Sequence, residues 1–213
     1  MNTPKTTAQQ SLLLTLVLIG WFALIAQLYI QLGSSHASTI ELTIRYFSYF
    51  TILSNLLVTI SATVLLLNPT ISLTSFLSKP QTLTAIAVYI LIVCIIYNAV
   101  LRSIWQPEGL QKVVDELLHL IIPILYVIFW FVYVNKSQLQ WKDFQAWLIF
   151  PLIYVTFILL RGELSGFYPY PFMNVTKLGY QQVFINAFFI TLAFMFVSLI
   201  YIGIAKMKTN KRQ

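Results

Sequence analysis

Six stretches of the chain are apolar over a length that fits a lipid bilayer, and this pattern limits the possible folds most. A helix needs about 20 predominantly apolar residues to cross the hydrocarbon core. The stretches that meet this requirement are 11–32, 46–67, 82–105, 116–134, 144–160 and 180–205. They lack the alternation of apolar and polar residues that marks the strands of a membrane barrel. We therefore predict an all-α integral membrane protein, a six-transmembrane-helix bundle in which residues 1–213 form one transmembrane domain.

Charged residues are too few to cover a water-soluble surface. Asp, Glu, Lys and Arg make up 9% of the 213 residues, whereas soluble domains average roughly 25%. This composition excludes a cytosolic enzyme, a nucleic-acid-binding module and a disordered protein. The net charge of +7 comes largely from the C-terminus, because four of the thirteen cations lie in the last eight residues. Cys94 is the single cysteine, so no intrachain disulfide is possible, and we expect neither a metal nor a cofactor.

The distribution of cations predicts the side of the membrane on which the termini lie. Six spans place both termini on one side, and Lys and Arg concentrate in cytoplasmic segments. If the termini are cytoplasmic, the inner segments hold eight Lys and Arg residues and the outer segments hold five. We therefore predict that both termini are cytoplasmic and that His36 lies in an outer loop.

Polar side chains gather in the outer halves of the predicted spans. In lipid, such residues usually face the bundle interior or a cavity. Ser48, Thr51 and Asn55 follow helical offsets of 3 and 4 on span 46–67, so they are expected on one face. Residues at a similar depth on other spans, with charged neighbours at the rim, are Asn98, Asp115, His119, Arg161, Glu163 and Asn186. Asp115 and His119 share a helical face at i,i+4. Five of the six predicted helices converge polar groups at one depth, which suggests a site.

The chemistry that this set allows is acyl transfer or ester hydrolysis. A histidine oriented by a carboxylate can act as a general base toward a hydroxyl, and Thr51 with His119 fits this logic. The amides of Asn55, Asn98 and Asn186 can donate hydrogen bonds to a developing oxyanion. The same asparagines can equally serve as interhelical hydrogen-bonding groups.

A non-catalytic transporter or lipid-binding protein remains an alternative use of the same polar cavity. Against transport, the spans show neither inverted repeats nor the Gly- or Pro-broken helices that usually form a transport site.

Two signatures in the sequence resemble a known group of proteins. They are YFSYFTILSN at 46–55 and RGELSGFYPYPF at 161–172. In these segments the chain resembles small bacterial six-span membrane proteins that share F-F/S-Y-F-T-x-x-S-N and R-G-x-x-S/T-G-x-Y-P-Y-P-F. More distantly, it resembles the eukaryotic androgen-induced and androgen-dependent TFPI-regulating membrane proteins, which are intramembrane threonine hydrolases of fatty acid esters of hydroxy fatty acids.

The distant resemblance implies roles for individual residues. The catalytic threonine falls on Thr51, and the catalytic histidine falls on His119, which keeps its spacing to Pro123. Asp115 stands where those proteins have a further histidine, and Tyr170 belongs to a matched Tyr-Pro-Phe element.

Together, the resemblances imply a hydrolase of a lipid acyl ester in the bacterial cytoplasmic membrane, with its cavity near the outer leaflet. The expected partners are membrane lipids and no nucleic acid, and the sequence carries no prediction of oligomeric state. Ser48, Asp115, Arg161, Glu163 and Tyr170 are expected to support the site. The prolines and aromatic residues of 167–172 fit either an interfacial aromatic belt or a short cap over the cavity.

Overall fold

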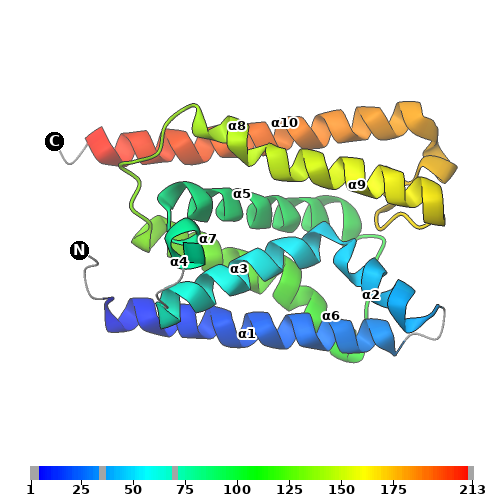
Figure 1. Cartoon of the computed structure of the whole chain (residues 1–213), viewed down its shortest axis with the longest axis horizontal. Coiled ribbons are helices and arrows are strands. Elements are labelled where there is room, and N and C mark those ends of the chain that lie inside the picture. The colour runs from blue at the N-terminus through cyan, green and yellow to red at the C-terminus, as the bar shows by residue number, and fades with distance from the viewer. Residues whose placement is uncertain (1–4, 34–36, 69–71, 211–213) are drawn as a thin grey trace.

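Helices are the only regular secondary structure in the residues that the computed structural model of the protein describes, which are 5–33, 37–68 and 72–210 (Figure 1). These segments contain no strand, which confirms the predicted all-α class. Six helices are long and apolar enough to cross a membrane, as predicted: Thr7–Leu32, Phe50–Leu67, Pro80–Leu101, Gly109–Tyr133, Asp143–Ser165 and Val175–Met207. The chain is therefore a multi-pass helical membrane protein. His36, predicted in an outer loop, lies outside the described residues.

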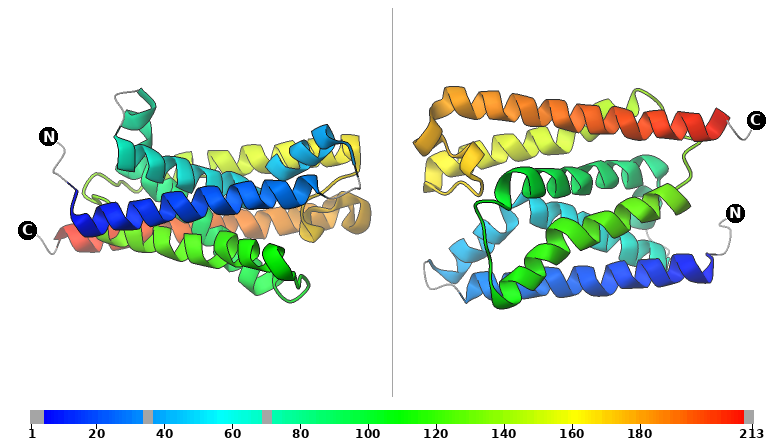
Figure 2. Two further views of the ribbon diagram at one scale, coloured as in Figure 1. Left: turned by 90° about the horizontal axis from the view of Figure 1, so that it is seen from below. Right: turned by 180° about the vertical axis from the view of Figure 1, so that it is seen from behind.

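The spans lie side by side with their long axes roughly aligned (Figures 1 and 2). The elements are α1 (Thr7–Leu32), α2 (Thr39–Phe47), α3 (Phe50–Leu67), α4 (Ser72–Leu77), α5 (Pro80–Ile96), α6 (Gly109–Glu116), α7 (Ile122–Tyr133), α8 (Asp143–Trp147), α9 (Ile149–Ser165) and α10 (Val175–Asn210). Helices α9 and α10 form one edge, α1 forms the other, and α3, α5 and α7 lie between them. The start of α1 and the end of α10 lie at the same end of the bundle. We call the opposite end, where α2, α6 and the 166–174 loop lie, the site end.

The predicted span 46–67 is wrong at its outer end, because the chain breaks there into two helices. Helix α2 ends at Phe47 and α3 begins at Phe50, with Tyr49 in an extended conformation between them. The Ser48 hydroxyl donates to the Ile44 carbonyl at 2.7 Å, and the Ser48 carbonyl accepts from the Tyr154 hydroxyl at 2.8 Å. These bonds satisfy the carbonyl groups of Ile44 and Ser48, which would accept backbone hydrogen bonds in a continuous helix. Ser48 is therefore not on the face of α3 that carries Thr51.

The other spans differ from the predicted boundaries mainly at their ends. The helix that holds His119 begins at Gly109 rather than 116, and the third span leaves the helix after Leu101 rather than at 105. The first helix begins at Thr7 rather than 11, and the fifth extends to Ser165 rather than 160. The last begins at Val175 and is interrupted by non-helical Gly179, immediately before the predicted start at 180. Hydropathy locates the part of a helix that lies in lipid, whereas caps and turns decide where the helix ends.

Two central spans contain a π-helical turn at the site end. These turns are Tyr97–Leu101, which follows α5, and Leu117–Ile121, which joins α6 to α7. In the first, the Arg102 amide donates to the Tyr97 carbonyl at 2.8 Å, five residues back. A π turn contains one residue more than an α-helical turn, and this extra residue changes the direction in which nearby side chains point. Both turns therefore affect how the predicted site residues are presented.

Helices α1 and α3 pack closely through a small residue. A Cβ atom added at Gly20 would lie 2.3 Å from the Thr59 Oγ1 atom. Small residues allow this close approach of helices in a membrane, where burial from lipid gives little driving force. The contact fixes α3 against α1, and so fixes the helix that carries Thr51.

Candidate functional site

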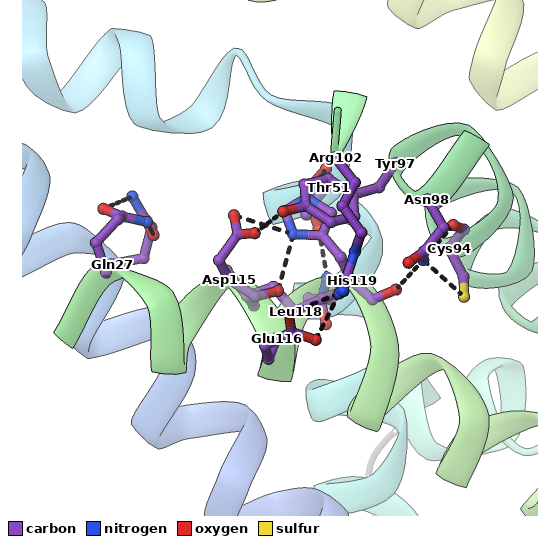
Figure 3. A network of polar contacts seen from close by, with 12 residues as sticks. Gln27, Thr51, Cys94, Tyr97, Asn98, Arg102, Asp115, Glu116, Leu118 and His119 are labelled. Atoms are coloured by element: carbon purple, nitrogen blue, oxygen red, sulfur yellow. Dashed lines mark hydrogen bonds and ion pairs between the residues drawn. The ribbon is translucent and has the colours of Figure 1, made fainter. Parts of the chain in front are cut away.

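Thr51 and His119 meet at the site end of the bundle (Figure 3). The Thr51 Oγ1 atom lies 3.3 Å from the His119 Nε2 atom, within hydrogen-bonding distance. Thr51 is in the first turn of α3, and His119 is in the π turn Leu117–Ile121. The Thr51 residue is 7% exposed, and the His119 side chain is 13% exposed. The structure thus brings together the two residues to which the sequence assigned catalytic roles, 68 positions apart in the chain.

The surroundings of the other imidazole nitrogen assign the tautomer of His119. Its Nδ1 atom lies 2.9 Å from the Asp115 carbonyl oxygen and 3.3 Å from the Asp115 carboxylate. A carbonyl oxygen can only accept a hydrogen bond, so Nδ1 carries the hydrogen. In the neutral imidazole the lone pair is then on Nε2, which faces the Thr51 hydroxyl. This arrangement is the one that a general base needs.

Tyr97 holds both His119 and Asp115 in place. Its ring stacks on the His119 ring, with centroids 3.9 Å apart and an interplanar angle of 18°. Its hydroxyl donates to the Asp115 Oδ2 atom. Asp115 is 5% exposed, and its carboxylate receives this bond in addition to its contact with His119. The sequence analysis missed Tyr97, because a tyrosine near the end of a span ordinarily belongs to the interfacial aromatic belt.

Tyr170 approaches Thr51 from the 166–174 loop. Its hydroxyl accepts a hydrogen bond from the Thr51 amide at 3.3 Å and lies 3.4 Å from the Thr51 Oγ1 atom. Burial raises the pKa of the Tyr170 hydroxyl, so it keeps its proton at neutral pH. If the Thr51 hydroxyl donates to His119, the Tyr170 hydrogen is available to another acceptor. Tyr170 therefore provides a hydrogen-bond donor beside the Thr51 oxygen, in line with its predicted supporting role.

The three predicted oxyanion donors use their amides to bond backbone carbonyls. Asn55 donates to the carbonyls of Thr51 and Leu118, at 2.8 and 3.1 Å. Asn98 donates to the Cys94 carbonyl at 2.8 Å, and Asn186 donates to the Phe172 carbonyl at 2.8 Å. Both Asn55 hydrogens are occupied, so this buried side chain joins α3 to the π turn that holds His119. Asn55 thus makes an interhelical hydrogen bond of the kind that the alternative describes, whereas the Asn98 bond stays within its own helix and the Asn186 bond reaches the 166–174 loop.

The charged residues predicted at the rim have different partners. The buried Arg161 guanidinium donates to Glu41 at 2.8 Å, and Arg45 donates to the same carboxylate oxygen at 2.7 Å. Both guanidinium groups lie over the ring of Phe167, at 4.6 and 4.7 Å from its centroid. We call Glu41, Arg45, Arg161 and Phe167 the loop clamp, because they fasten the start of the loop that carries Tyr170. Glu163 is exposed and accepts from the Tyr180 hydroxyl at 2.8 Å.

Thr51, Tyr97, Leu101, His119 and Tyr170 each line two neighbouring pockets. The first, which we call the apolar pocket, has a volume of about 60 Å³. Its walls include Phe50, Ile92, Val93, Ile96, Ile190 and Phe194. The second, which we call the wide pocket, has a volume of about 430 Å³. Its walls include Gln27, Gln31, Trp105, Gln111, Asp115 and Pro169. The Thr51–His119 pair thus stands where an apolar space meets a more polar one.

Across residues 5–33, 37–68 and 72–210, no group of three or more His, Cys, Asp or Glu side chains could hold a metal ion. Comparison of the chain with protein-family models, with curated proteins and with solved structures found no match. The fold and the site define a polytopic helical membrane protein with a buried Thr–His–Asp arrangement at one end of its bundle.

Proposed function

We propose that the protein is an intramembrane hydrolase of a lipid acyl ester, with Thr51 as nucleophile and His119 as general base. The observation that carries this proposal is the 3.3 Å contact between Thr51 Oγ1 and His119 Nε2, on a ring whose Nδ1 faces Asp115. A hydroxyl, a histidine with its lone pair on the hydroxyl, and a carboxylate behind the histidine form the arrangement that activates hydroxyl nucleophiles.

The first half of the proposed reaction forms an acyl-enzyme. His119 takes the Thr51 proton while the Thr51 oxygen attacks the ester carbonyl carbon, and negative charge develops on the carbonyl oxygen. The Tyr170 hydroxyl, beside Thr51 Oγ1, is placed to donate to that oxygen. The bond from the carbonyl carbon to the alcohol oxygen then breaks, and the alcohol leaves with the proton held by His119.

The second half releases the acid. His119 takes a proton from a water molecule, whose oxygen attacks the acyl carbon, and the bond to Thr51 breaks as His119 returns the proton to the Thr51 oxygen. The products are a carboxylic acid and the free enzyme. Asp115 stabilises the imidazolium that forms in both halves, and stacking of Tyr97 limits rotation of the ring.

We further propose that both termini face the cytoplasm of a bacterial cell and that the site end faces the outer leaflet of the cytoplasmic membrane. The inner segments would hold eight Lys and Arg residues and one of the six acidic residues, Asp143. The site end would hold five of each sign. This asymmetry supports the orientation under the positive-inside rule.

Variants of Thr51 and His119 test the hydrolase proposal. We expect the purified protein to release nitrophenol from a medium-chain nitrophenyl ester and to react covalently with a fluorophosphonate. Thr51→Ser should retain measurable turnover, whereas Thr51→Val should abolish it, because only a hydroxyl can form the acyl intermediate. His119→Gln should reduce the rate about 100-fold or more. Thr156→Val is a matched control, because this threonine is exposed on α9 and bonds its own helix.

The alternative function is a non-catalytic transporter or lipid-binding protein that uses the wide pocket. In such a protein, loss of the Thr51 hydroxyl would remove one hydrogen bond and change ligand affinity only about two- to tenfold. Equal ester hydrolysis by the wild-type protein and the Thr51→Val variant would therefore overturn the hydrolase proposal and leave this alternative.

A further inference from the structure

We infer that the substrate is an ester of an uncharged, hydroxyl-bearing alcohol, such as a monoacylglycerol or an acylated sugar, whose alcohol part occupies the wide pocket. This inference rests on the proposed function and specifies its substrate class. The apolar pocket would hold the first carbons of the acyl chain. Three observations support the inference: the different polarity of the two pockets, the charges around the wide pocket, and an amide pair in its wall.

The polarity of the two pockets decides which of them holds the alcohol. The leaving alcohol must take its proton from the His119 Nε2 atom, and His119 lines both pockets, so an ester bound at Thr51 can extend into either. Asp115 lines the wide pocket and does not line the apolar pocket, whose walls are mostly aliphatic and aromatic. The first carbons of the acyl chain therefore fit the small apolar pocket, and the alcohol fits the wide one.

The charges around the wide pocket exclude an anionic alcohol part. No Lys or Arg is among the residues that line it, whereas the Asp115 carboxylate is. The nearby Arg102, which lies 5.5 Å from the centre of the Tyr97 ring, bonds both Glu116 oxygens at 2.6 Å. An anion in this pocket would face the Asp115 carboxylate with no Lys or Arg in the pocket wall, which is unfavourable. Phosphate or carboxylate on the alcohol side should therefore be rejected.

The amide pair offers hydrogen bonds to hydroxyl groups. The Gln111 side chain donates to the Gln27 side-chain oxygen at 2.9 Å, and Gln27 donates back to Gln111 at 3.5 Å. Each side chain uses one of its two amide hydrogens in this pair, so each keeps one donor and a further acceptor position. Both residues line the wide pocket. Neutral amides that donate and accept are suited to alcohol hydroxyls, which also do both.

Four substrates with the same medium-length acyl chain test the inference on the purified full-length protein. They are a monoacylglycerol, the corresponding acylglycerol phosphate, an ester of a hydroxy fatty acid with its free carboxylate, and a nitrophenyl ester. We expect kcat/KM for the monoacylglycerol to exceed that for either anionic ester at least tenfold. Equal or better hydrolysis of an anionic ester would overturn the inference. Thr51-dependent release of nitrophenol in the same assay would keep the proposed function intact, whereas its absence would overturn that function instead.

Variants of the amide pair test whether the preference for a hydroxyl-bearing alcohol arises in the wide pocket. Gln27→Leu and Gln111→Leu should each lower kcat/KM for the monoacylglycerol about tenfold and lower nitrophenyl ester hydrolysis clearly less, because nitrophenol carries no further hydroxyl. Gln111→Arg should reduce the discrimination against the phosphate. Gln145→Leu, an exposed position on α8 at the other end of the bundle, is the matched control. Equal losses for both esters in the two Leu variants would show that the pair is only structural and would overturn its assigned role.

Discussion

At the scale of single residues, the backbone takes part in holding His119, the proposed general base. The His119 Nδ1 atom faces two acceptors from Asp115, its carbonyl oxygen at 2.9 Å and its carboxylate at 3.3 Å. In a familiar serine triad the carboxylate alone fixes the tautomer, and its replacement by an amide costs about 10⁴-fold in rate. Here the carbonyl fixes the tautomer even without the carboxylate.

We therefore expect Asp115→Asn to be milder than the same change in a serine triad. The variant loses the charge that stabilises the imidazolium, but Nδ1 still donates to the backbone carbonyl. The rate of Thr51-dependent ester hydrolysis should fall roughly 10- to 100-fold, the effect of one charge-assisted hydrogen bond. His119→Gln in the same assay gives the residual rate of hydrolysis without the proposed general base. If Asp115→Asn is as inactive as His119→Gln, the carbonyl does not hold the tautomer.

The sequence identified some of these residues and missed others for a physical reason. Thr51 and His119 were identifiable because a hydroxyl stripe and a solitary histidine are conspicuous in apolar spans. The asparagines were as conspicuous, yet their amides bond the carbonyls of Thr51, Leu118, Cys94 and Phe172. The type of a polar residue does not reveal whether its donors are already used. Tyr97, Gln27 and Gln111 carried no local signal, because their partners lie on other helices.

At the scale of elements, the 166–174 loop folds back onto the bundle through specific contacts. Gly166 has a positive φ of 70° and ends α9, with its amide donating to the Gly162 carbonyl at 2.8 Å. A Cβ atom at Gly162 would lie 2.0 Å from the Tyr168 ring, so only glycine permits the loop to lie this close. In the loop clamp, the guanidinium groups of Arg45 and Arg161 then both contact the Phe167 ring. Together these contacts bring Tyr170 to Thr51, an arrangement closer to a cap than to a belt.

The loop clamp should make the protein sensitive to acid. The hydrogen bond from Arg45, with further help from Arg161, lowers the pKa of Glu41 below its ordinary value of 4.5. A carboxylate with a lowered pKa stabilises the fold above the ordinary value, and this contribution is lost as pH falls through the lowered pKa. At pH 7, Glu41→Gln should lower the midpoint of thermal unfolding by about 2–4 °C, the equivalent of about 1 kcal/mol.

The pH dependence of the loss in unfolding midpoint distinguishes an electrostatic effect of the loop clamp from a nonspecific loss of stability. The difference in unfolding midpoint between the wild-type protein and Glu41→Gln should shrink below pH 4.5, because the wild-type carboxylate becomes protonated. Glu108→Gln, at an exposed position before α6, is the control and should change little at either pH. A deficit in Glu41→Gln that is the same at pH 7 and pH 3.5 would contradict an electrostatic clamp.

The helices themselves were largely predictable, and the irregular turns between them were not. All six apolar runs of the sequence became membrane-crossing helices, because hydropathy and length suffice to define a span. The break at Ser48 depends on the Tyr154 hydroxyl from α9, which no local pattern reveals. The π turns Tyr97–Leu101 and Leu117–Ile121 likewise interrupt runs that read as ordinary apolar helix in the sequence. The site is built at these three irregular places, so its geometry was the least predictable part of the fold.

At the scale of the whole molecule, charge is distributed unequally between the two ends of the bundle. Among the described residues, the segments at the end that carries the termini hold one acidic residue, Asp143, and six cations, whereas the segments at the site end hold five acidic residues and five cations. Several charges at the site end are paired, as Arg102 is with Glu116 and Arg161 with Glu41. Cations on the trans side of a membrane are disfavoured during insertion, so this asymmetry favours cytoplasmic termini.

Reporter fusions check this orientation. Green fluorescent protein joined to the C-terminus should fluoresce in a bacterial host, and alkaline phosphatase at the same position should be inactive, because each reporter functions on one side of the membrane. Phosphatase inserted in the 106–108 loop, at the site end, should be active. An active phosphatase at the C-terminus would place the site toward the inner leaflet.

The extra residue in each π turn matters for the geometry of the site, whereas the helix can cross the membrane without it. A π turn contains one residue more than an α-helix needs for the same turn. Deletion of one residue from Leu117–Ile121 would leave an apolar helix still long enough to span the bilayer. It would, however, convert the π turn into an α-helical turn and change the directions in which its side chains, His119 among them, point. Under the proposed function, a descendant of this chain can therefore lose its hydrolase chemistry through the loss of one codon and persist as an intact six-helix membrane protein.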